Sequence, residues 1–582
     1  MANYQAGYVL DDGYAWCLVT WLTMELLFLG TILVYLVPRM NQLEPPAKYP
    51  VEGKRLMHKI FKTVDWLCDQ NDADTTFASF LSGWFIGAKV SELRRGNMVQ
   101  FLAWTMYAKE WSVTDAEERA DIMDMVKVTE GRLGKNFKFG PGYNPQVTSI
   151  RHTLDPVVPF SHRPLALYAV LGFCRAVVRA GLNLWGFRRS LAPCGTFYYW
   201  FRKAPYSSDL AKGGKERDGL APMVLFHGVG TGLPFYVLAL WKMCRERTSV
   251  IVESPSIAMS LALLRGHRPP SESQLVESVE GIMGRHGLKT AAFFGHSFGS
   301  ISVAWMARRK PHLVSQIVLL DPVCLLLFLP NVARSFLCPD TKRMPLLERV
   351  MLYLVTAEKG ISHTLRRHFW WYANVMWPED VKCPIVVGLA GLDRIVPTRP
   401  LRRYLLSHGD FATTNNKSVD GLVNGGGGGG KNNSSVGRSS AGGVFGGRHG
   451  LGRPGGGFAL MNGNGRCKVH TCNVKCKCTG HGGGAGHVTA PCHSSGGLPS
   501  AANNGVSIRG DSRRGARPPA AKGGSSSSCS RSDVDKSGGG VAKRVELVHW
   551  PDAGHGNVLG DPWALDEFIG VATRQEEAFL VS

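Results

Sequence analysis

The sequence predicts an α/β fold: a doubly wound, mostly parallel sheet with helices on both faces. Short apolar runs recur through the middle and the end of the chain, and several end directly in Gly, His or Asp. Segments with apolar residues at helical spacing separate these runs, an alternation that is typical of parallel sheets. The predicted strands lie, in chain order, in APMVLFHG, SVIVESP, TAAFF, SQIVLLDP, PIVVGL and RVELVHW.

One strand and its two flanking helices justify this prediction in detail. The first helix is expected to begin at Glu272, has apolar residues three and four apart, and ends at His286-Gly287. The strand TAAFF follows it. The second helix, SISVAWMARRK, ends in basic residues, which favour the negative end of the helix dipole. The turn between strand and helix contains the pentapeptide GHSFG, with Ser297 at its centre.

Ser297 is the candidate nucleophile. On a strand-to-helix turn its hydroxyl is expected to stand exposed at the carboxyl edge of the sheet, and the two glycines of GHSFG permit the tight turn. A base must take the proton of this hydroxyl. His555 qualifies because it follows the last predicted strand at the same edge. His296 is expected to point away from the nucleophile's side, and His227 belongs to an earlier loop, so both are weaker candidates.

Two carboxylates compete to orient His555. Asp393 follows the penultimate strand and Asp321 follows the strand before it, so both loops lie at the correct edge. We favour Asp393, because Asp321 precedes a proline and is explained as a turn residue. The oxyanion of an acyl-transfer intermediate needs backbone N–H donors. One is expected from Phe298, directly after the nucleophile, and a second from Val229 in the loop HGVGTG.

The segments FHGVG, GHSFGS, LDRIVP and DAGHG resemble the α/β-hydrolase superfamily in order and spacing. The resemblance is to membrane-anchored serine hydrolases of the lipase and esterase kind, and it covers 221–408 and 541–573. It implies a triad of Ser297, Asp393 and His555 acting on esters, thioesters or amides, with neither a cofactor nor a metal ion. The serine argues against relatives that open epoxides or remove halides with an aspartate. Acyltransferase relatives carry H-x-x-x-x-D, and here Asp561 lies one residue too far from His555.

Near the N-terminus the stretch 15–37 contains a single charge, Glu25. As a helix it would be roughly 35 Å long, enough to cross a bilayer once. No Lys or Arg precedes it, whereas Arg39 and several further basic residues follow, so the positive-inside rule places the rest of the chain in the cytosol. The alternative is a buried helix of a globular domain.

Composition divides the remainder of the chain. Residues 411–540 hold 34 of the 69 glycines and 16 Lys/Arg against 4 Asp/Glu, so +12 of the formal +22 lies there. Such a composition predicts a disordered insertion, and we expect no nucleic-acid partner from the charge alone. The predicted organisation is an N-terminal segment (1–43), a largely helical region (44–215), the hydrolase core (216–410) with a cap at about 325–377, the insertion, and the end of the core (541–582).

Cysteines agree with a cytosolic location. Those outside the insertion have no paired spacing, which is typical of reduced thiols. Inside it, CKVHTCNVKCKC is interpreted as a weak, adventitious metal tract, because no repeated C-x-x-C pair accompanies it.

Two regions outside the core have less definite roles. The apolar segment 165–187 carries Arg175 and Arg179 on one face. It is either an amphipathic helix on a membrane or, slightly favoured, a helix packed on the core with two snorkelling arginines. The aromatic content of the cap favours an apolar substrate.

Two hypotheses follow for the whole chain. The first is a cytosol-facing, membrane-anchored esterase or lipase that cleaves a carboxylic ester of an acyl lipid through an acyl-enzyme. The second is a catalytically silent hydrolase-fold scaffold that binds partners through its basic insertion. A complete triad with an oxyanion loop favours the first, because a scaffold has no physical need of these residues.

Overall fold

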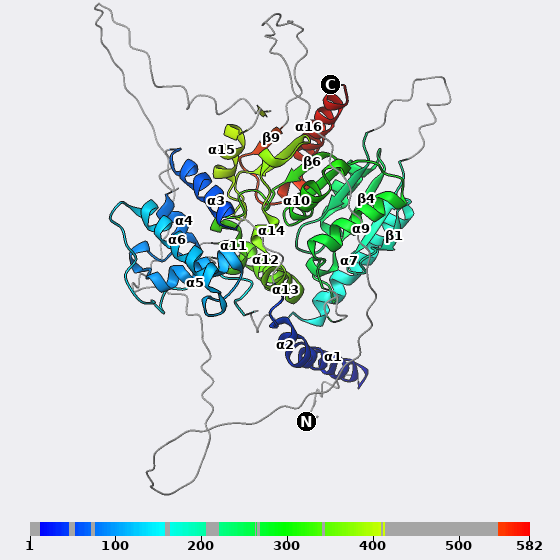
Figure 1. Cartoon of the computed structure of the whole chain (residues 1–582). Coiled ribbons are helices and arrows are strands. Elements are labelled where there is room, and N and C mark those ends of the chain that lie inside the picture. Colours follow the sequence, from blue (N-terminus) through cyan, green and yellow to red (C-terminus); the bar gives the residue numbers. More distant parts are fainter. Residues whose placement is uncertain are drawn as a thin grey trace, which may run out of the picture. The chain divides into compact units, whose positions relative to one another are not determined.

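The structure is a computed structural model of the chain (Figure 1), and it describes residues 12–45, 53–70, 76–156, 163–204, 220–261, 264, 268–339, 344–408, 411–413 and 545–581. Its core is a nine-stranded sheet. The strands are β1 (Arg188–Leu191), β2 (Tyr198–Arg202), β3 (Met223–Phe226), β4 (Ser249–Glu253), β5 (Ala291–His296), β6 (Val314–Leu320), β7 (Ile385–Ala390), β8 (Phe411–Thr413) and β9 (Val545–Trp550). Every predicted strand is present, and the predicted fold class is confirmed.

The sheet is mostly parallel. The strands lie in the order β1-β2-β4-β3-β5-β6-β7-β9-β8. The β1–β2 and β2–β4 pairs are antiparallel, and all remaining pairs are parallel. Because parallel strands end at one edge, the loops after β5, β6, β7 and β9 meet there.

Three strands go beyond the sequence-based prediction. The β1–β2 hairpin lies in the region that we expected to be largely helical. Strand β8 pairs with β9 at the start of the segment expected to be disordered, so the sheet includes residues up to Thr413. These edge strands have three to five residues, too few to show a clear periodicity. The rest of the predicted insertion, with its cysteine tract, lies outside the described residues.

Helices cover both faces of the sheet. On one face, α9 and α10 pack against alternate residues such as Phe293 and Ile317. On the other, α8 and α16 pack against the intervening residues, such as Phe294 and Val318. The helices are α1 (Asp12–Gly30), the π-helical η1 (Thr31–Leu36), α2 (Val37–Met40), α3 (Gly53–Cys68), α4 (Phe77–Trp84), α5 (Arg95–Tyr107), α6 (Ala116–Leu133), α7 (Leu165–Leu184), α8 (Val237–Cys244), α9 (Glu272–Arg285), α10 (Gly299–Arg309), α11 (Pro330–Leu337), α12 (Leu346–Thr356), α13 (Lys359–Arg367), α14 (Trp371–Asn374), α15 (Thr398–His408) and α16 (Pro562–Val581).

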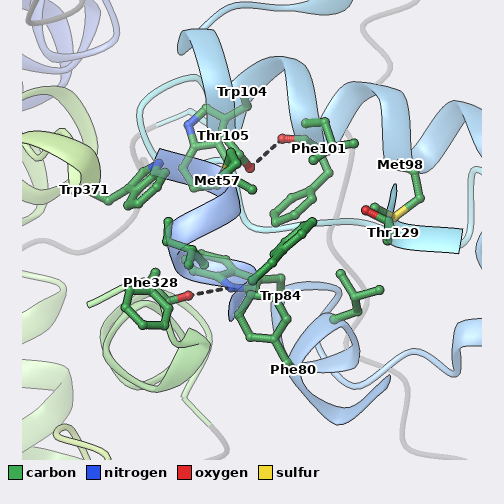
Figure 2. A pocket seen from close by; sticks show the side chains of 14 residues that line it. Met57, Phe80, Trp84, Met98, Phe101, Trp104, Thr105, Thr129, Phe328 and Trp371 are labelled. Carbon is green, nitrogen blue, oxygen red and sulfur yellow. Dashed lines mark hydrogen bonds between the residues drawn. The ribbon is translucent and has the colours of Figure 1, made fainter. Parts of the chain in front are cut away.

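The cap expected between two core strands is present as α11–α14, and it shares a core with the N-terminal helices. Figure 2 shows Trp84, Phe101 and Trp104 of α4 and α5 converging with Phe328 and Trp371 of this insert. The Trp84 indole N–H donates to the carbonyl of Phe328 at 3.1 Å. The cavity among these rings measures about 20 Å³, so it is a packing gap and not a ligand site.

Within the part of the chain that the structure describes, two helices are long and apolar enough to cross a membrane, over Tyr14–Met40 and Leu165–Leu184. They contact each other, because Phe28 of α1 packs edge-on against Tyr168 of α7 with ring centroids 5.8 Å apart. Length and composition therefore suggest membrane association, while the single crossing and the cytosolic orientation remain predictions.

Candidate active site

Ser297 occupies a sharp turn between β5 and α10. Its φ of 51° lies in the left-handed region, which is strained for a residue with a side chain. The glycines on either side are required by packing: a Cβ at Gly299 would lie 2.3 Å from the Phe226 carbonyl oxygen, and one at Gly295 2.8 Å from the Ser300 Cα. The sequence GHSFG thus allows β3 and α10 to approach the turn closely.

The loops at this edge bring the three predicted triad residues together. Ser297 Oγ lies 2.8 Å from His555 Nε2, and His555 Nδ1 lies 2.6 Å from Asp393 Oδ2. The Asp393 side chain is fully buried, and its other oxygen accepts the backbone N–H groups of Ile395 and Val396. The carboxylate is therefore fixed by its own loop while it orients the imidazole.

Asp321, the competing acid, makes different contacts. Its oxygens accept the backbone N–H groups of Ala390 and Gly556, both at 2.8 Å. Its carboxylate thus joins the ends of β6 and β7 to the loop that carries His555. The residue is completely buried and has a φ of 44°, so it occupies a strained position without hydrogen-bonding the imidazole ring.

The other two histidines engage different partners. His227 Nδ1 donates to the carbonyl of Gly228, and its Nε2 accepts the N–H of Ser254. His296 Nδ1 lies 2.6 Å from the hydroxyl of Tyr236. Burial lowers the pKa of both imidazoles, which keeps them neutral.

Electrostatics support a base at His555. Burial lowers the pKa of this imidazole, but the hydrogen bond and charge of Asp393, together with the charge of Asp321, outweigh burial and raise it. Burial also raises the pKa of Asp321 to about 6, and the nearby charge of Asp393 acts in the same direction. Two carboxylates thus stabilise an imidazolium at His555.

Two backbone N–H groups are free to stabilise an oxyanion. Among the described residues, the N–H groups of Phe298 and Val229 have no hydrogen-bond acceptor. The Gly228 N–H, in contrast, donates to the Tyr236 hydroxyl at 2.7 Å. Glycine at position 228 leaves room for the turn, because a Cβ there would approach the Ser297 Cβ to 3.0 Å, closer than most Cβ contacts. Sequence reasoning missed Tyr236, since no motif marks a side chain that fixes this loop.

The hydroxyl is not exposed, contrary to our expectation. Ser297 is only 2 % exposed, because the turn lies beneath the loops and the insert that surround this edge. A cavity of about 30 Å³ lies beside Phe298, and a larger one of about 540 Å³ adjoins it. The two cavities share the lining residues Pro269, Pro270, Trp305 and His368.

Two further groups of titratable residues have structural explanations. Asp561 caps α16 by accepting the N–H groups of Trp563 and Ala564, so its carboxylate serves the helix start. Glu44, His363 and His368 bring possible metal-ligand atoms within 4.8 Å of one another. Arg268, however, forms an ion pair with Glu44 at 2.7 Å, and a second cation at this position would be repelled.

The sheet order, the strained serine turn and the loops at the carboxyl edge define an α/β-hydrolase fold. No protein-family model matches the sequence, and no curated protein matches it either. Among solved structures, the chain is similar to a bacterial membrane phospholipase A, at 15% identity over 41% of this chain and 82% of that one, with a TM-score of 0.28. Naproxen esterase from Bacillus subtilis (13%, 40%, 85%, TM-score 0.28) and an enol-lactonase from Burkholderia xenovorans (14%, 37%, 87%, TM-score 0.25) are also similar. At these identities the likeness concerns the fold alone.

Proposed function

We propose that the chain is a membrane-associated serine hydrolase that cleaves a carboxylic ester through an acyl-enzyme. The observation that carries this proposal is the hydrogen-bonded series from Ser297 through His555 to Asp393, with distances of 2.8 and 2.6 Å. A protein without catalytic activity would have little need of these three hydrogen-bonded side chains next to two backbone N–H groups that lack acceptors.

The proposed reaction follows from these contacts. His555 Nε2 accepts the proton of Ser297 as Oγ attacks the ester carbonyl, and Asp393 stabilises the imidazolium that forms. The N–H groups of Phe298 and Val229 donate to the oxyanion. The imidazolium then protonates the departing alcohol, leaving an acyl-serine. Water attacks this acyl-serine with His555 again as base, which releases the acid and restores the enzyme.

An acyl lipid is the proposed substrate class. Apolar side chains, including Phe226, Ile257 and Phe298, line the small cavity beside the serine turn, and the adjoining cavity of about 540 Å³ is in the size range of ligand pockets. The N-terminal apolar helix would keep the enzyme on a membrane, and the basic residues after it favour the cytosolic side. A single crossing by 15–37 further requires that this helix is free of the protein surface over the thickness of the bilayer.

Labelling with a fluorophosphonate tests the reaction directly. The wild-type chain should be labelled and should hydrolyse a soluble short-chain ester, and Ser297→Ala should abolish labelling and lower kcat by about 10³-fold or more. Ser273→Ala changes an exposed serine of α9 that lines neither cavity at this edge, and as the control it should keep both activities. Unlabelled wild-type protein that is fully folded would favour the silent scaffold.

A further inference from the structure

Helix α7 presents an apolar side to the outside of the molecule. Val170, Phe173, Val177 and Leu184 are 59, 71, 55 and 90 % exposed. Four exposed alanines extend this side: Ala166, Ala169, Ala176 and Ala180. We call these eight residues the α7 face. A continuous apolar face of this length is unusual on a soluble monomer and marks a contact surface.

The two charges of α7 hold the helix against the core. Arg175 donates to the carbonyls of Ala258 and Met259 at 3.0 and 3.3 Å, and Arg179 Nε donates to the buried carboxylate of Glu253 at 3.2 Å. The favoured sequence interpretation is a helix packed on the core with two snorkelling arginines. The helix packs on the core, but both guanidinium groups bind protein acceptors and do not extend into solvent. Leaving the core to cross a bilayer would strip both guanidinium groups of these partners.

Helix α1 continues the same surface. Glu25, its only central charge, accepts the N–H of Leu165 at the start of α7 at 3.0 Å. From there onward, one side of α1, η1 and α2 is buried against α7 and its neighbours. The buried residues of this contact are Phe28, Ile32, Leu36, Met40 and Tyr168. The opposite side stays exposed, as at Leu26, which is 68 % exposed.

This contact limits how far α1 can reach. The charge-free stretch between Asp12 and Glu25 has twelve residues, about 18 Å as a helix. The hydrocarbon core of a bilayer is about 30 Å thick. With Glu25 held at the start of α7, the part of the helix before Glu25 is too short to cross, so the single span that the sequence predicts requires this contact to open.

We infer that the α7 face and the exposed side of α1 together insert into one leaflet of a lipid bilayer. A bilayer fits better than a second copy of the chain, because the exposed residues of both helices are mostly apolar, and Glu25, Arg175 and Arg179 are paired with groups of the protein. Tyr14 and Trp16, which are 73 and 71 % exposed, are residue types favoured at the lipid–water boundary.

The same surface leads to the candidate active site. The short helix η5 (Leu233–Tyr236) contacts α7, and its exposed Phe235 lies beside Gly556, next to His555. Insertion of α7 would therefore bring the loop of His555 close to the lipid surface, where an acyl chain could enter. This link to the substrate rests on the proposed function, whereas the lipid contact does not.

Photocrosslinking of the full chain in membranes tests the lipid contact. A benzophenone amino acid in place of Phe173 should crosslink to labelled phosphatidylcholine. The same probe in place of Val113, an equally exposed apolar residue of the helical region (67 %), should not. A crosslink from position 173 to a second copy of the chain, or equal lipid crosslinking at both positions, would overturn the inference. Because this readout needs no catalysis, it is independent of the proposed function.

Kinetics test the consequence. The double variant Phe173→Asp, Val177→Asp should lose at least about tenfold in kcat/KM towards an oleoyl ester of a fluorogenic alcohol in phosphatidylcholine vesicles. Its rate on a soluble butyryl ester should match the wild type, as should both rates of Val113→Asp. Unchanged hydrolysis in vesicles would refute the inferred role of α7, and wild-type protein inactive on both esters would refute the proposed function instead.

An extension before Met1 that carries a glycosylation sequon tests the depth of α1. Insertion in one leaflet from the cytosol leaves this sequon unmodified, whereas a glycan on it would show a full crossing and overturn that part of the inference.

Discussion

Exchanging each of the two acids at the active site for asparagine separates their roles. Asp393→Asn keeps the volume of the side chain but removes its negative charge. The carboxylate oxygen that lies 2.6 Å from His555 Nδ1 becomes part of a neutral amide. The imidazole then loses its anionic partner and is free to adopt the tautomer that cannot accept the proton of Ser297. Such a change lowers kcat by roughly 10⁴, which corresponds to about 5.5 kcal/mol in activation free energy.

Asp321→Asn should behave differently. The asparagine oxygen can still accept one of the two N–H groups, of Ala390 or Gly556, while its NH₂ group faces the second one. This lost hydrogen bond should lower the free energy of unfolding by about 1–3 kcal/mol. Removing a buried carboxylate whose pKa is raised to about 6 opposes this cost, so the variant should fold. Since Asp321 does not touch the imidazole ring, we expect kcat to fall by less than about tenfold.

The assay is hydrolysis of a soluble short-chain ester, with circular dichroism to verify that both variants fold. Folded variants in which Asp321→Asn loses the larger factor would refute the assignment of Asp393. Equal and small losses in both would show that the two carboxylates substitute for each other beside His555.

Three further predictions concern the same edge of the sheet. The kcat/KM of the wild type should decrease as the pH falls below the raised pKa of His555, because imidazolium cannot accept a proton. In Asp321→Asn the midpoint of this decrease should move to lower pH, because one of the charges that raise the pKa is lost. A shift of the midpoint to higher pH would contradict the electrostatic argument. Gly299→Ala should unfold at markedly lower urea concentration or remain insoluble, because its Cβ would lie 2.3 Å from the Phe226 carbonyl oxygen, whereas Gly284→Ala, with open space around it, should not. Tyr236→Phe removes the acceptor of the Gly228 N–H and the partner of His296, so urea unfolding should show a loss of about 1–3 kcal/mol, and unchanged stability would indicate that water replaces the hydroxyl.

The central sheet could be predicted from the sequence because its strands are buried on both faces. Strands such as β5 and β7 are continuous apolar runs bounded by glycine or turn residues, so they stand out without any knowledge of tertiary contacts. The positions of Ser297, Asp393 and His555 after these strands followed from one rule, that loops after parallel strands share an edge. The short edge strands β1, β2 and β8 depend on pairing with a neighbour, which no local pattern encodes.

The less predictable features are those in which one side chain serves a distant backbone group. Asp321 looks like a turn residue before proline, and only the structure shows its carboxylate between β7 and the His555 loop. The burial of Ser297 likewise depends on surrounding segments far away in the sequence. Such contacts have no fixed spacing along the chain and leave no periodic signal.

The apolar helices are a further case in which the sequence predicts an element but not its tertiary contacts. Composition alone predicts that 15–37 spans a membrane and leaves open whether the arginines of 165–187 face the protein or a membrane surface. Hydropathy depends on residue types only and contains no information on the contacts of each side chain. Once Glu25 is paired with the first turn of α7, and Arg175 and Arg179 with the core, the same residues divide into an inner polar side and an outer apolar side. A helix divided in this way satisfies its charges on the protein and offers mostly apolar side chains to its surroundings, which suits a position in a membrane surface and not across it.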